Sequence, residues 1–265
     1  MIMNDKIVLA ERIPHLGRED LRLPFEARLR RLASDLEVSV QLEGVTKNGF
    51  PTIRVKGPDV EACTELIRRK LGIAPAGRSE IEVNDNFKAY ATGISTRRQT
   101  IEIQIGPISM SFRSEIAREA LMAQLCDGRS FPVERIAQTY CIQEGVPVHV
   151  RVTSINTEVK EIEVWLSDDQ VSQFEDWRRQ RFHRIIAVGG FQDRIREAIR
   201  LSKVERDVIE VDELSLTAHS LVCKLGTEAP GIIAKIGRYV GDFRLYAFLP
   251  DRVDKIRITT PERPS

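Results

Sequence analysis

The feature that most constrains the fold is a run of strict alternation between residues 146 and 153. Valine occupies every second position, and proline or a polar residue stands between: Val146, Pro147, Val148, His149, Val150, Arg151, Val152 and Thr153. Successive side chains of a β-strand point to opposite faces, so a period of two indicates a strand with one buried face. Thr100–Ile105 has the same period, with isoleucine at positions 101, 103 and 105. Both segments are therefore predicted to be half-buried strands.

Three more strands are predicted in the same part of the chain, at Phe87–Thr92, Ile108–Phe112 and Glu161–Leu166. Two helical pieces separate the third predicted strand from the fourth. Five strands with helix at this position follow the order of an OB-type barrel. The segment from Gly145 to Ser167 resembles the last two strands of an S1-type RNA-binding module. We therefore expect residues 85–167 to form a five-stranded OB-like β-barrel.

The first 84 residues predict a different arrangement, in the order β-α-β-β-α-β. One helix is indicated by apolar residues at i, i+4, i+7 and i+11, which are Phe25, Leu29, Leu32 and Leu36. A second helix is expected to begin at Asp59 and to stop at Gly72. The strands are expected at Lys6–Ala10, Val38–Leu42, Thr52–Val55 and Ser79–Val83. This order predicts a split βαβ, or ferredoxin-like, domain over residues 1–84.

Residues 168–258 predict the same order after a leading helix. Ser167 and Gln170 have the spacing of a capping box, and the helix that follows buries Val171, Phe174 and Trp177. The strands expected beyond it are Arg184–Val188, Asp207–Val211, Ser220–Leu225 and Phe243–Leu249, with helices after Gly190 and from Pro230 to Tyr239. The predicted fold class is therefore α+β, with two ferredoxin-like units flanking the barrel. Residues 259–265 are expected to be a frayed tail.

Composition restricts the classes of protein that fit. The chain has 265 residues, of which 42% are hydrophobic and 30% charged, and this excludes a disordered chain. Forty Lys and Arg against 39 Asp and Glu leave a net charge of +1, so no overall field attracts nucleic acid or anionic membrane. No apolar run approaches the about 18 residues of a membrane span. The four cysteines form no Cys-x-x-Cys pair, so buried thiols in a cytoplasmic protein are expected.

The segment from Cys223 to Gly231, with the sequence CKLGTEAPG, resembles an archaeal protein family catalogued as domain of unknown function number twenty-one ten. Trp177, Arg184-Ile185-Ile186 and Asp207-Val208-Ile209 stand where the pattern of that family places them. The resemblance spans most of the chain and is strongest after Phe174. It implies an archaeal source and brings no activity with it, because the family carries none.

Basic residues concentrate in the last third of the chain. Between positions 178 and 206 nine basic residues face only three acidic ones, Asp193, Glu197 and Glu205. The nine are Arg178, Arg179, Arg181, Arg184, Arg194, Arg196, Arg200, Lys203 and Arg206. Guanidinium groups offer paired donors to phosphate, and the interleaved Trp177, Phe182 and His183 could stack on unpaired bases. The segment therefore predicts contact with nucleic acid.

Spacing within this segment sharpens that prediction. Arg196, Arg200 and Lys203 recur at i, i+4 and i+7, so they share one helix face. The alternative is an ordinary solvated helix face that the fold neutralises with the acidic residues Asp207, Glu210, Asp212 and Glu213.

The predicted outer face of the barrel offers secondary contacts. Lys88, Tyr90, Arg97 and Arg98 are candidates for binding a polynucleotide, together with Arg151 and with Trp165 as a stacking platform. Glu102, Glu161 and Glu163 lie on the same predicted face and would repel phosphates. A protein partner fits such a surface equally well.

A second kind of site is predicted at the loop from Gly226 to Gly231. A strand that runs through such a loop into a helix places backbone amides at a helix N-terminus, which can bind an anion. The candidate residues are Lys224, Gly226, Thr227 and Gly231. The run resembles the strand, loop and helix that begin an ACT-type regulatory module, and this resemblance implies a small ligand. The sheets of the ferredoxin-like units could also pair edge to edge in a homodimer. The alternative is a purely structural loop with Pro230 in the first helical turn.

Catalysis finds little support. The four histidines show no metal-ligand spacing with one another or with cysteine, and no nucleophile motif is present. We therefore expect a non-enzymatic protein without cofactor or metal, which binds RNA or a ribonucleoprotein or transcription assembly. The other possibility is a ligand-responsive or oligomerising module that binds a small anion.

Overall fold

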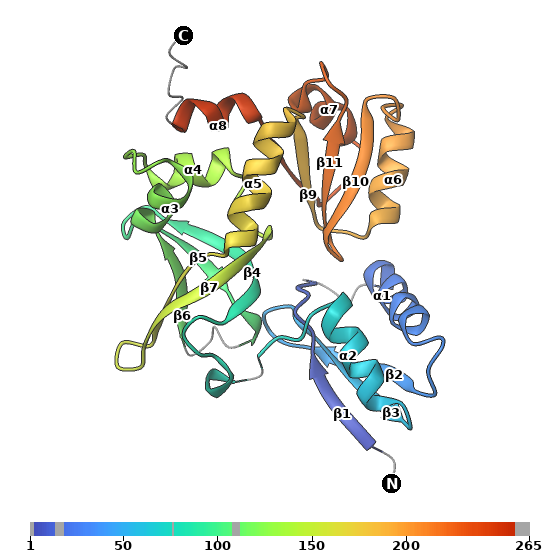
Figure 1. Ribbon diagram of the computed structural model, residues 1–265. Coiled ribbons are helices and arrows are strands. Elements are labelled where there is room, and N and C mark those ends of the chain that lie inside the picture. The colour runs from blue at the N-terminus through green and yellow to red at the C-terminus, as the bar shows by residue number, and fades with distance from the viewer. Residues whose placement is uncertain (1–2, 14–18, 76, 108–111, 258–265) are drawn as a thin grey trace, which may run out of the picture.

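The computed structural model describes residues 3–13, 19–75, 77–107 and 112–257, which form three packed units (Figure 1). The first unit is a three-stranded antiparallel sheet in the order β1-β3-β2, against which two helices pack. Its elements are β1 (Met3–Val8), α1 (Glu19–Leu32), β2 (Ser39–Val45), β3 (Pro51–Gly57) and α2 (Val60–Lys70). Phe25 and Leu29 of α1 are buried against the sheet, as their helical spacing predicts.

The prediction of a fourth strand at Ser79–Val83 is wrong. Residues Arg78–Glu80 form a short 3₁₀ turn instead, and the Arg78 guanidinium donates a hydrogen bond to the carbonyl of Ile81 at 2.7 Å. The Ile81 side chain is buried in the core of the barrel, not in the first unit. This apolar contact draws the segment away from the edge of β1, so the first sheet has three strands among the described residues.

The second unit is a closed barrel with the strand order β4-β5-β6-β8-β7. Its strands are β4 (Asn86–Ser95), β5 (Thr100–Gln104), β6 (Arg113–Ala117), β7 (Pro147–Asn156) and β8 (Glu161–Leu166). β6 and β8 are parallel, and the other neighbours are antiparallel. Helices α3 (Arg118–Leu125) and α4 (Val133–Thr139) stand between the third and fourth strands. Val148, Val150 and Val152 point into the core, which confirms the alternating pattern.

One predicted barrel strand cannot be compared directly. Ile108–Phe112 lies outside the described residues except for Phe112, and the third strand of the barrel begins at Arg113.

The third unit is a four-stranded antiparallel sheet in the order β10-β11-β9-β12. Its elements are β9 (Arg184–Val188), α6 (Gln192–Leu201), β10 (Val208–Ser215), β11 (Ala218–Cys223), α7 (Ala229–Ile236) and β12 (Arg244–Phe248). Ile195 and Ile199 of α6 share a core with Ile232 and Ile236 of α7. The predicted sequence of elements β-α-β-β-α-β is therefore present in this unit.

Two helices join the barrel to the third unit, α5 (Asp168–Gln180) and α8 (Pro250–Ile256). The Ser167 hydroxyl accepts a hydrogen bond from the Gln170 amide at 3.2 Å, which confirms one half of the predicted capping box; the other half is absent, because the Ser167 amide donates to the His149 carbonyl. The Gln170 side chain accepts from the His149 amide at 2.9 Å and so ties α5 to β7. Trp177 of α5 lies edge-on to Phe248 of β12, with ring centroids 5.3 Å apart. The barrel and the third unit consequently share one apolar core.

All three units meet at Glu11, in the segment that follows β1. Its buried carboxylate forms an ion pair with Lys88 of β4 and accepts a hydrogen bond from the Leu216 amide at 2.9 Å. Leu216 stands at the tip of the β10–β11 hairpin and packs into the core of the first unit. One carboxylate therefore contacts the barrel and the third unit at once.

Two further findings concern the class of protein. No described helix is both long enough and apolar enough to cross a lipid bilayer. All four cysteines are free and buried, and burial raises the pKa of the Cys141 thiol to about 12.

Candidate nucleic-acid interface

The predicted basic segment divides into two groups that behave differently in the fold. The first group contains the four arginines of α5 and of the residues that lead to β9, and all four are held in internal contacts. They are Arg178, Arg179, Arg181 and Arg184.

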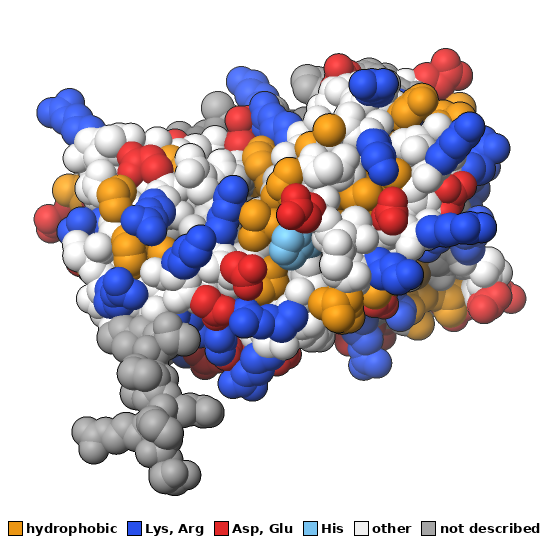
Figure 2. Space-filling model, turned by 90° about the horizontal axis from the view of Figure 1, so that it is seen from above, with side chains coloured by type: hydrophobic (Ala, Val, Ile, Leu, Met, Phe, Trp, Pro, Cys, Tyr) orange, Lys and Arg blue, Asp and Glu red, His pale blue; other side chains and the backbone are white. Residues whose placement is uncertain are grey.

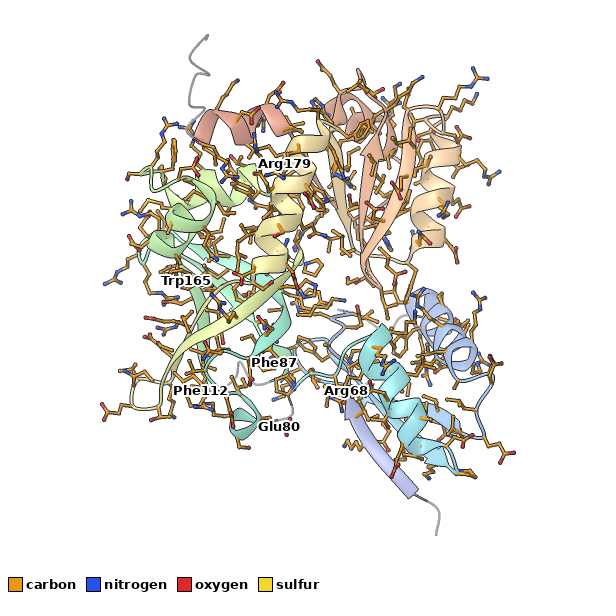
Figure 3. The ribbon with its side chains drawn as sticks, in the orientation of Figure 1. Arg68, Glu80, Phe87, Phe112, Trp165 and Arg179 are labelled. Carbon is orange, nitrogen blue, oxygen red and sulfur yellow. The ribbon has the colours of Figure 1, made fainter. Side chains whose placement is uncertain are left out.

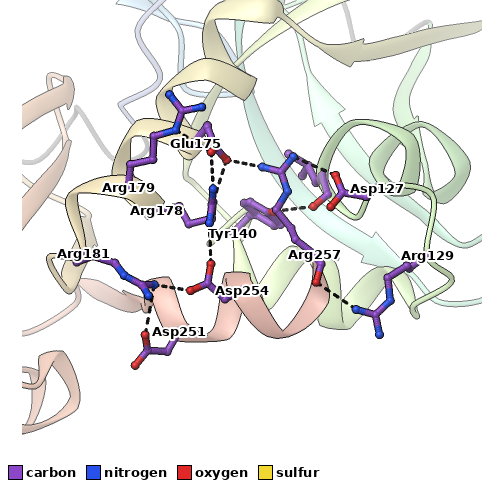
Figure 4. Close-up of polar contacts among 11 residues, drawn as sticks. Asp127, Arg129, Tyr140, Glu175, Arg178, Arg179, Arg181, Asp251, Asp254 and Arg257 are labelled. Carbon is purple, nitrogen blue, oxygen red and sulfur yellow. Dashed lines mark hydrogen bonds and ion pairs between the residues drawn. The ribbon is translucent and has the colours of Figure 1, made fainter. Parts of the chain in front are cut away.

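Three of these arginines form an ion-pair network between α5 and α8 (Figure 4). Arg178 contacts Glu175 at 2.6 Å and Asp254 at 2.8 Å, and Arg179 contacts Glu175 at 2.9 Å. Arg181 pairs with the same Asp254 carboxylate. The hydrogen bond from Arg178 is the main reason that the pKa of Glu175 lies below its ordinary value.

Arg184 is buried at the start of β9. Its guanidinium contacts Asp212 at 2.9 Å, donates to the Ser220 hydroxyl at 3.0 Å, and lies 4.9 Å from the Trp177 ring. A phosphate cannot reach this cation. The prediction of Arg184 as a phosphate contact is therefore wrong. Arg178 and Arg181 are paired with Asp254, which lies more than 70 residues away in the sequence, but they remain partly exposed, and their role as phosphate contacts stays a prediction.

The second group is open to solvent. Arg196 and Arg200 lie on α6, whereas Lys203 follows the end of the helix at Leu201 and has a left-handed backbone, so the predicted shared helix face holds for the two arginines only. Arg196, Arg200 and Lys203 are exposed, and none of them has an ion pair or side-chain hydrogen bond with any described residue. We call these three residues the α6 basic surface. The apolar face of the same helix, with Ile195 and Ile199, is buried, so the helix is oriented with Arg196 and Arg200 outward. Arg194 differs, because its guanidinium lies 5.7 Å from the Phe243 ring.

Charges of both signs are mixed on the upper face of the molecule (Figure 2). Figure 2 views the molecule from above, the end that carries α7 and α8 in Figure 1. Lys and Arg side chains are spread over the third unit in this view, with Asp and Glu among them. The cations therefore form short clusters and not one large patch of a single sign.

The barrel candidates are mostly unavailable to a ligand. Tyr90 is 1% exposed, and its hydroxyl lies 3.3 Å from the Ala10 carbonyl. Burial is the main reason that its pKa lies well above the ordinary value. Lys88 is committed to the buried carboxylate of Glu11. Both predictions are wrong, because the first unit packs over this part of β4.

The turn between β4 and β5 is different. Arg97 is exposed there and has no ion pair with a described residue, whereas Arg98 contacts Glu102 at 2.8 Å and Glu115 at 3.3 Å. Arg151 contacts Asp168 at 3.5 Å, so Arg97 is the one barrel cation among the candidates that has no ion pair with a described residue.

The predicted anion loop also lacks the free backbone amides that would bind an anion. The Ala229 amide donates to His183 Nδ1 at 3.3 Å, position 230 is proline, and the Gly231 amide donates to the Glu228 carbonyl at 3.1 Å. Each position of the first turn of α7 therefore lacks a free N–H. Thr227 does not cap the helix, because the residue at the cap is Glu228. Lys224 and Gly226 are exposed but have no cluster of free amides to assist them.

A groove on the barrel was not predicted. It has a volume of about 590 Å³ and is lined by Arg12, Thr92, Glu102, Ile103, Gln104, Phe112, Arg113, Ser114, Val159 and Lys160. Its cations come from three separate parts of the chain, so no local cluster marks them in the sequence. The alternating pattern of β5 predicts which of its side chains face outward. It is the one sequence pattern that could have pointed to the groove.

The arrangement offers no sign of a metal centre. Among the residues that the structure describes, no three His, Cys, Asp or Glu side chains gather closely enough to hold a metal ion. His219 is fully buried, its Nε2 lies 3.0 Å from the Gly190 carbonyl, and burial lowers its pKa to about 4.

Comparison with known families identifies the third unit. Residues 182–242 match the model of the DUF2110 C-terminal domain. This match agrees with the family that the sequence resembles, over the matched residues. The matched segment runs from just before β9 to the turn before β12. No curated protein matches the chain.

Proposed function

We propose that this protein is a non-enzymatic, cytoplasmic RNA-binding protein, acting alone or within a ribonucleoprotein or transcription assembly. One observation carries the proposal. Arg196 and Arg200 of α6 and Lys203 just beyond its end keep their charges open to solvent, while Arg178 and Arg184 are paired with carboxylates. Exposed cations at this spacing can follow a phosphate backbone and release its counterions.

The architecture supports the proposal at the level of the fold. The barrel closes through parallel pairing of its third and fifth strands and has helices between its third and fourth, which favours an OB-like assignment. The order β10-β11-β9-β12 favours a ferredoxin-like assignment for the third unit. Both folds occur in proteins that do not bind nucleic acid, so the cations and not the folds are the basis of the proposal.

The test is the salt dependence of RNA affinity. A fluorescent single-stranded RNA is titrated at several salt concentrations with the parent protein and with a triple variant, Arg196→Ala, Arg200→Ala and Lys203→Ala. If all three cations contact phosphates, the slope of log K against log salt becomes shallower by about 2, since each contact contributes about 0.7 on a single strand. The affinity at low salt falls as well.

A matched control separates local contact from net charge. The triple variant Lys47→Ala, Lys56→Ala and Lys70→Ala removes the same charge from exposed positions of the first unit. This control is expected to keep the parent slope. Equal slopes for the parent and the α6 variant would overturn the proposal.

A further inference from the structure

The barrel groove is built from side chains of opposite character. Phe112 and Ile103 provide apolar surface, and Arg12, Arg113 and Lys160 provide positive charge. Its volume of about 590 Å³ lies within the range of about 300–1,000 Å³ that small-ligand sites occupy. Figure 3 shows Phe112 on the lower side of the barrel, far from the upper right of the view where Figure 1 places α6. The groove is therefore distinct from the α6 basic surface.

Hydrogen bonds within the protein hold Arg12 in place. Its Nε donates to the Asn48 carbonyl at 3.1 Å, and its own carbonyl accepts from the Thr217 hydroxyl at 3.2 Å. These contacts come from the first and third units, whereas the groove lies on the barrel. Burial lowers the pKa of this arginine, and no described carboxylate lies within ion-pair distance of it. The charge of Glu144 acts on Arg12 from beyond ion-pair distance and opposes the effect of burial only in part, so the site still favours an anionic ligand.

Lys160 and Arg113 are the exposed cations at the rim of the groove. Lys160 lies at the end of the β7–β8 turn in the left-handed region, with φ of 56°, and its carbonyl accepts from the Arg113 amide at 2.9 Å. The Lys160 ammonium has no ion pair with a described residue. One Nη atom of Arg113 contacts Glu161 at 2.7 Å. The rest of its guanidinium group is left to contact a ligand. The rim thus has one open cation and one that is partly neutralised.

The acidic residue of the groove is also neutralised. Glu102 contacts Arg98 at 2.8 Å, so its charge does not oppose an anion in full. Thr92 and Gln104 also line the groove; they donate to the carbonyls of Glu102 and Gly106, at 3.2 and 3.3 Å, and keep their side-chain oxygens as acceptors. Such groups can bond the edge of a nucleobase.

Phe112 supplies the stacking surface. Its ring is half-buried against the core of the barrel, and the Arg78 guanidinium lies 5.8 Å from its centroid. A base stacks on an aromatic face only when it is unpaired, because a base pair in a duplex is already stacked on its neighbours.

We infer that the groove binds one unpaired nucleotide of a single-stranded RNA, with the base on Phe112 and the phosphates between Arg12 and Lys160. The inference rests on the proposed function and adds a preference for single strands. The α6 basic surface would attract any RNA, and the groove would select a strand with unpaired bases.

The test compares single-stranded with double-stranded RNA of equal phosphate number. The variants are Lys160→Ala and Phe112→Leu, and leucine keeps the apolar packing while it removes the aromatic face. Each variant is expected to lower affinity for single strands by about tenfold and to change affinity for the duplex less than twofold. Lys255→Ala, which removes an exposed cation of α8, serves as the matched control and is expected to change neither.

Two results separate failure of the inference from failure of the proposed function. If both groove variants bind single strands as well as the parent, or lose both RNAs equally, the inference is overturned while RNA binding stands. If the parent binds neither RNA, the proposed function fails. In that case adenosine monophosphate is titrated and the amide resonances of Thr92, Gln104 and Ser114 are followed. Saturable shifts would keep the nucleotide site, and unchanged resonances would remove it.

Discussion

Glu11 and Lys88 form an ion pair in the interior, with side-chain exposures of 3% and 16%, although they belong to different units of the fold. Burial raises the pKa of Glu11, and the attraction of Lys88 opposes that rise. The same carboxylate accepts the Leu216 amide and lies 3.4 Å from the Tyr90 hydroxyl. One charged group therefore contacts the barrel and the third unit from the first unit, beside the apolar contacts that also join these units.

Removal of one partner of this pair should cost more than removal of both charges. Lys88→Met leaves a buried carboxylate without its cation, and we expect a loss of about 3–5 kcal/mol in the free energy of unfolding. The double variant Lys88→Met with Glu11→Gln should lose less than the sum of the two single variants, because no uncompensated charge remains. Denaturant unfolding of the four proteins measures this coupling. Strict additivity would show that the pair does not act as a unit.

The network between α5 and α8 should contribute to stability and not to RNA binding. Asp254→Asn removes the carboxylate that Arg178 and Arg181 share, and an expected loss of about 1 kcal/mol reflects the partial exposure of the pairs. Asp251→Asn changes a more exposed partner of Arg181 and should have a smaller effect. Thermal unfolding measures both.

The same variant also checks the division of the basic segment. Asp254→Asn leaves the salt dependence of RNA affinity unchanged if only the α6 basic surface contacts phosphate. A steeper dependence in this variant would mean that the released arginines do reach RNA.

His219 should make the protein less stable in mild acid. Burial lowers its pKa to about 4 from the ordinary 6.5. Below about pH 6.5 the unfolded chain therefore binds a proton that the folded protein does not, and the free energy of unfolding falls as the pH drops towards 4.

Replacement of the imidazole isolates this contribution. Unfolding midpoints of the parent and of His219→Gln are compared at about pH 7.5 and about pH 5. The drop in stability should be smaller in the variant, because glutamine does not titrate in this range. His149, whose pKa burial also lowers, is common to both proteins and cancels in the comparison. Equal drops would assign the acid sensitivity to other groups.

Two glycines of the third unit should respond in opposite ways to alanine. A Cβ at Gly190 would lie 2.2 Å from Cζ of Phe243, so Gly190→Ala forces the ring to move and should cost about 1–3 kcal/mol. No atom lies within 4 Å of a Cβ at Gly231, which is inside α7. Gly231→Ala should therefore stabilise the protein by about 0.5–1 kcal/mol. Unfolding midpoints of the two variants measure the contrast, and destabilisation by Gly231→Ala would contradict the open geometry of the loop.

Local sequence patterns predicted helices and strands well where one face of the helix or strand packs on a core and the other faces solvent. The valines of β7 and the apolar spacing of Phe25 and Leu29 in α1 depend on neighbours a few residues away, and both predictions were confirmed. The cap at Ser167 is equally local. The strand predicted at Ser79–Val83 failed because Ile81 packs into the barrel, a contact with a different unit.

Predictions of the site depended on distant partners and were correct only in part. The sequence around Arg178 contains no sign of Asp254, which lies 76 residues away and neutralises it. Tyr90 has the alternation of an exposed strand residue but is covered by the segment after β1. The cations of the groove come from positions 12, 113 and 160, so only the closed barrel and its contact with the first unit bring them together.

The pairing of β12 with β9 has a consequence for how the chain can be divided. The family match ends at residue 242, and β12 begins at Arg244. A fragment limited to the matched residues would lose the strand that completes the sheet, together with Phe248, against which Trp177 and Phe174 pack. Such a fragment would present β9 as a bare apolar border and should associate with itself. The smallest autonomous piece at this end of the molecule is therefore larger than the stretch by which its relatives are recognised.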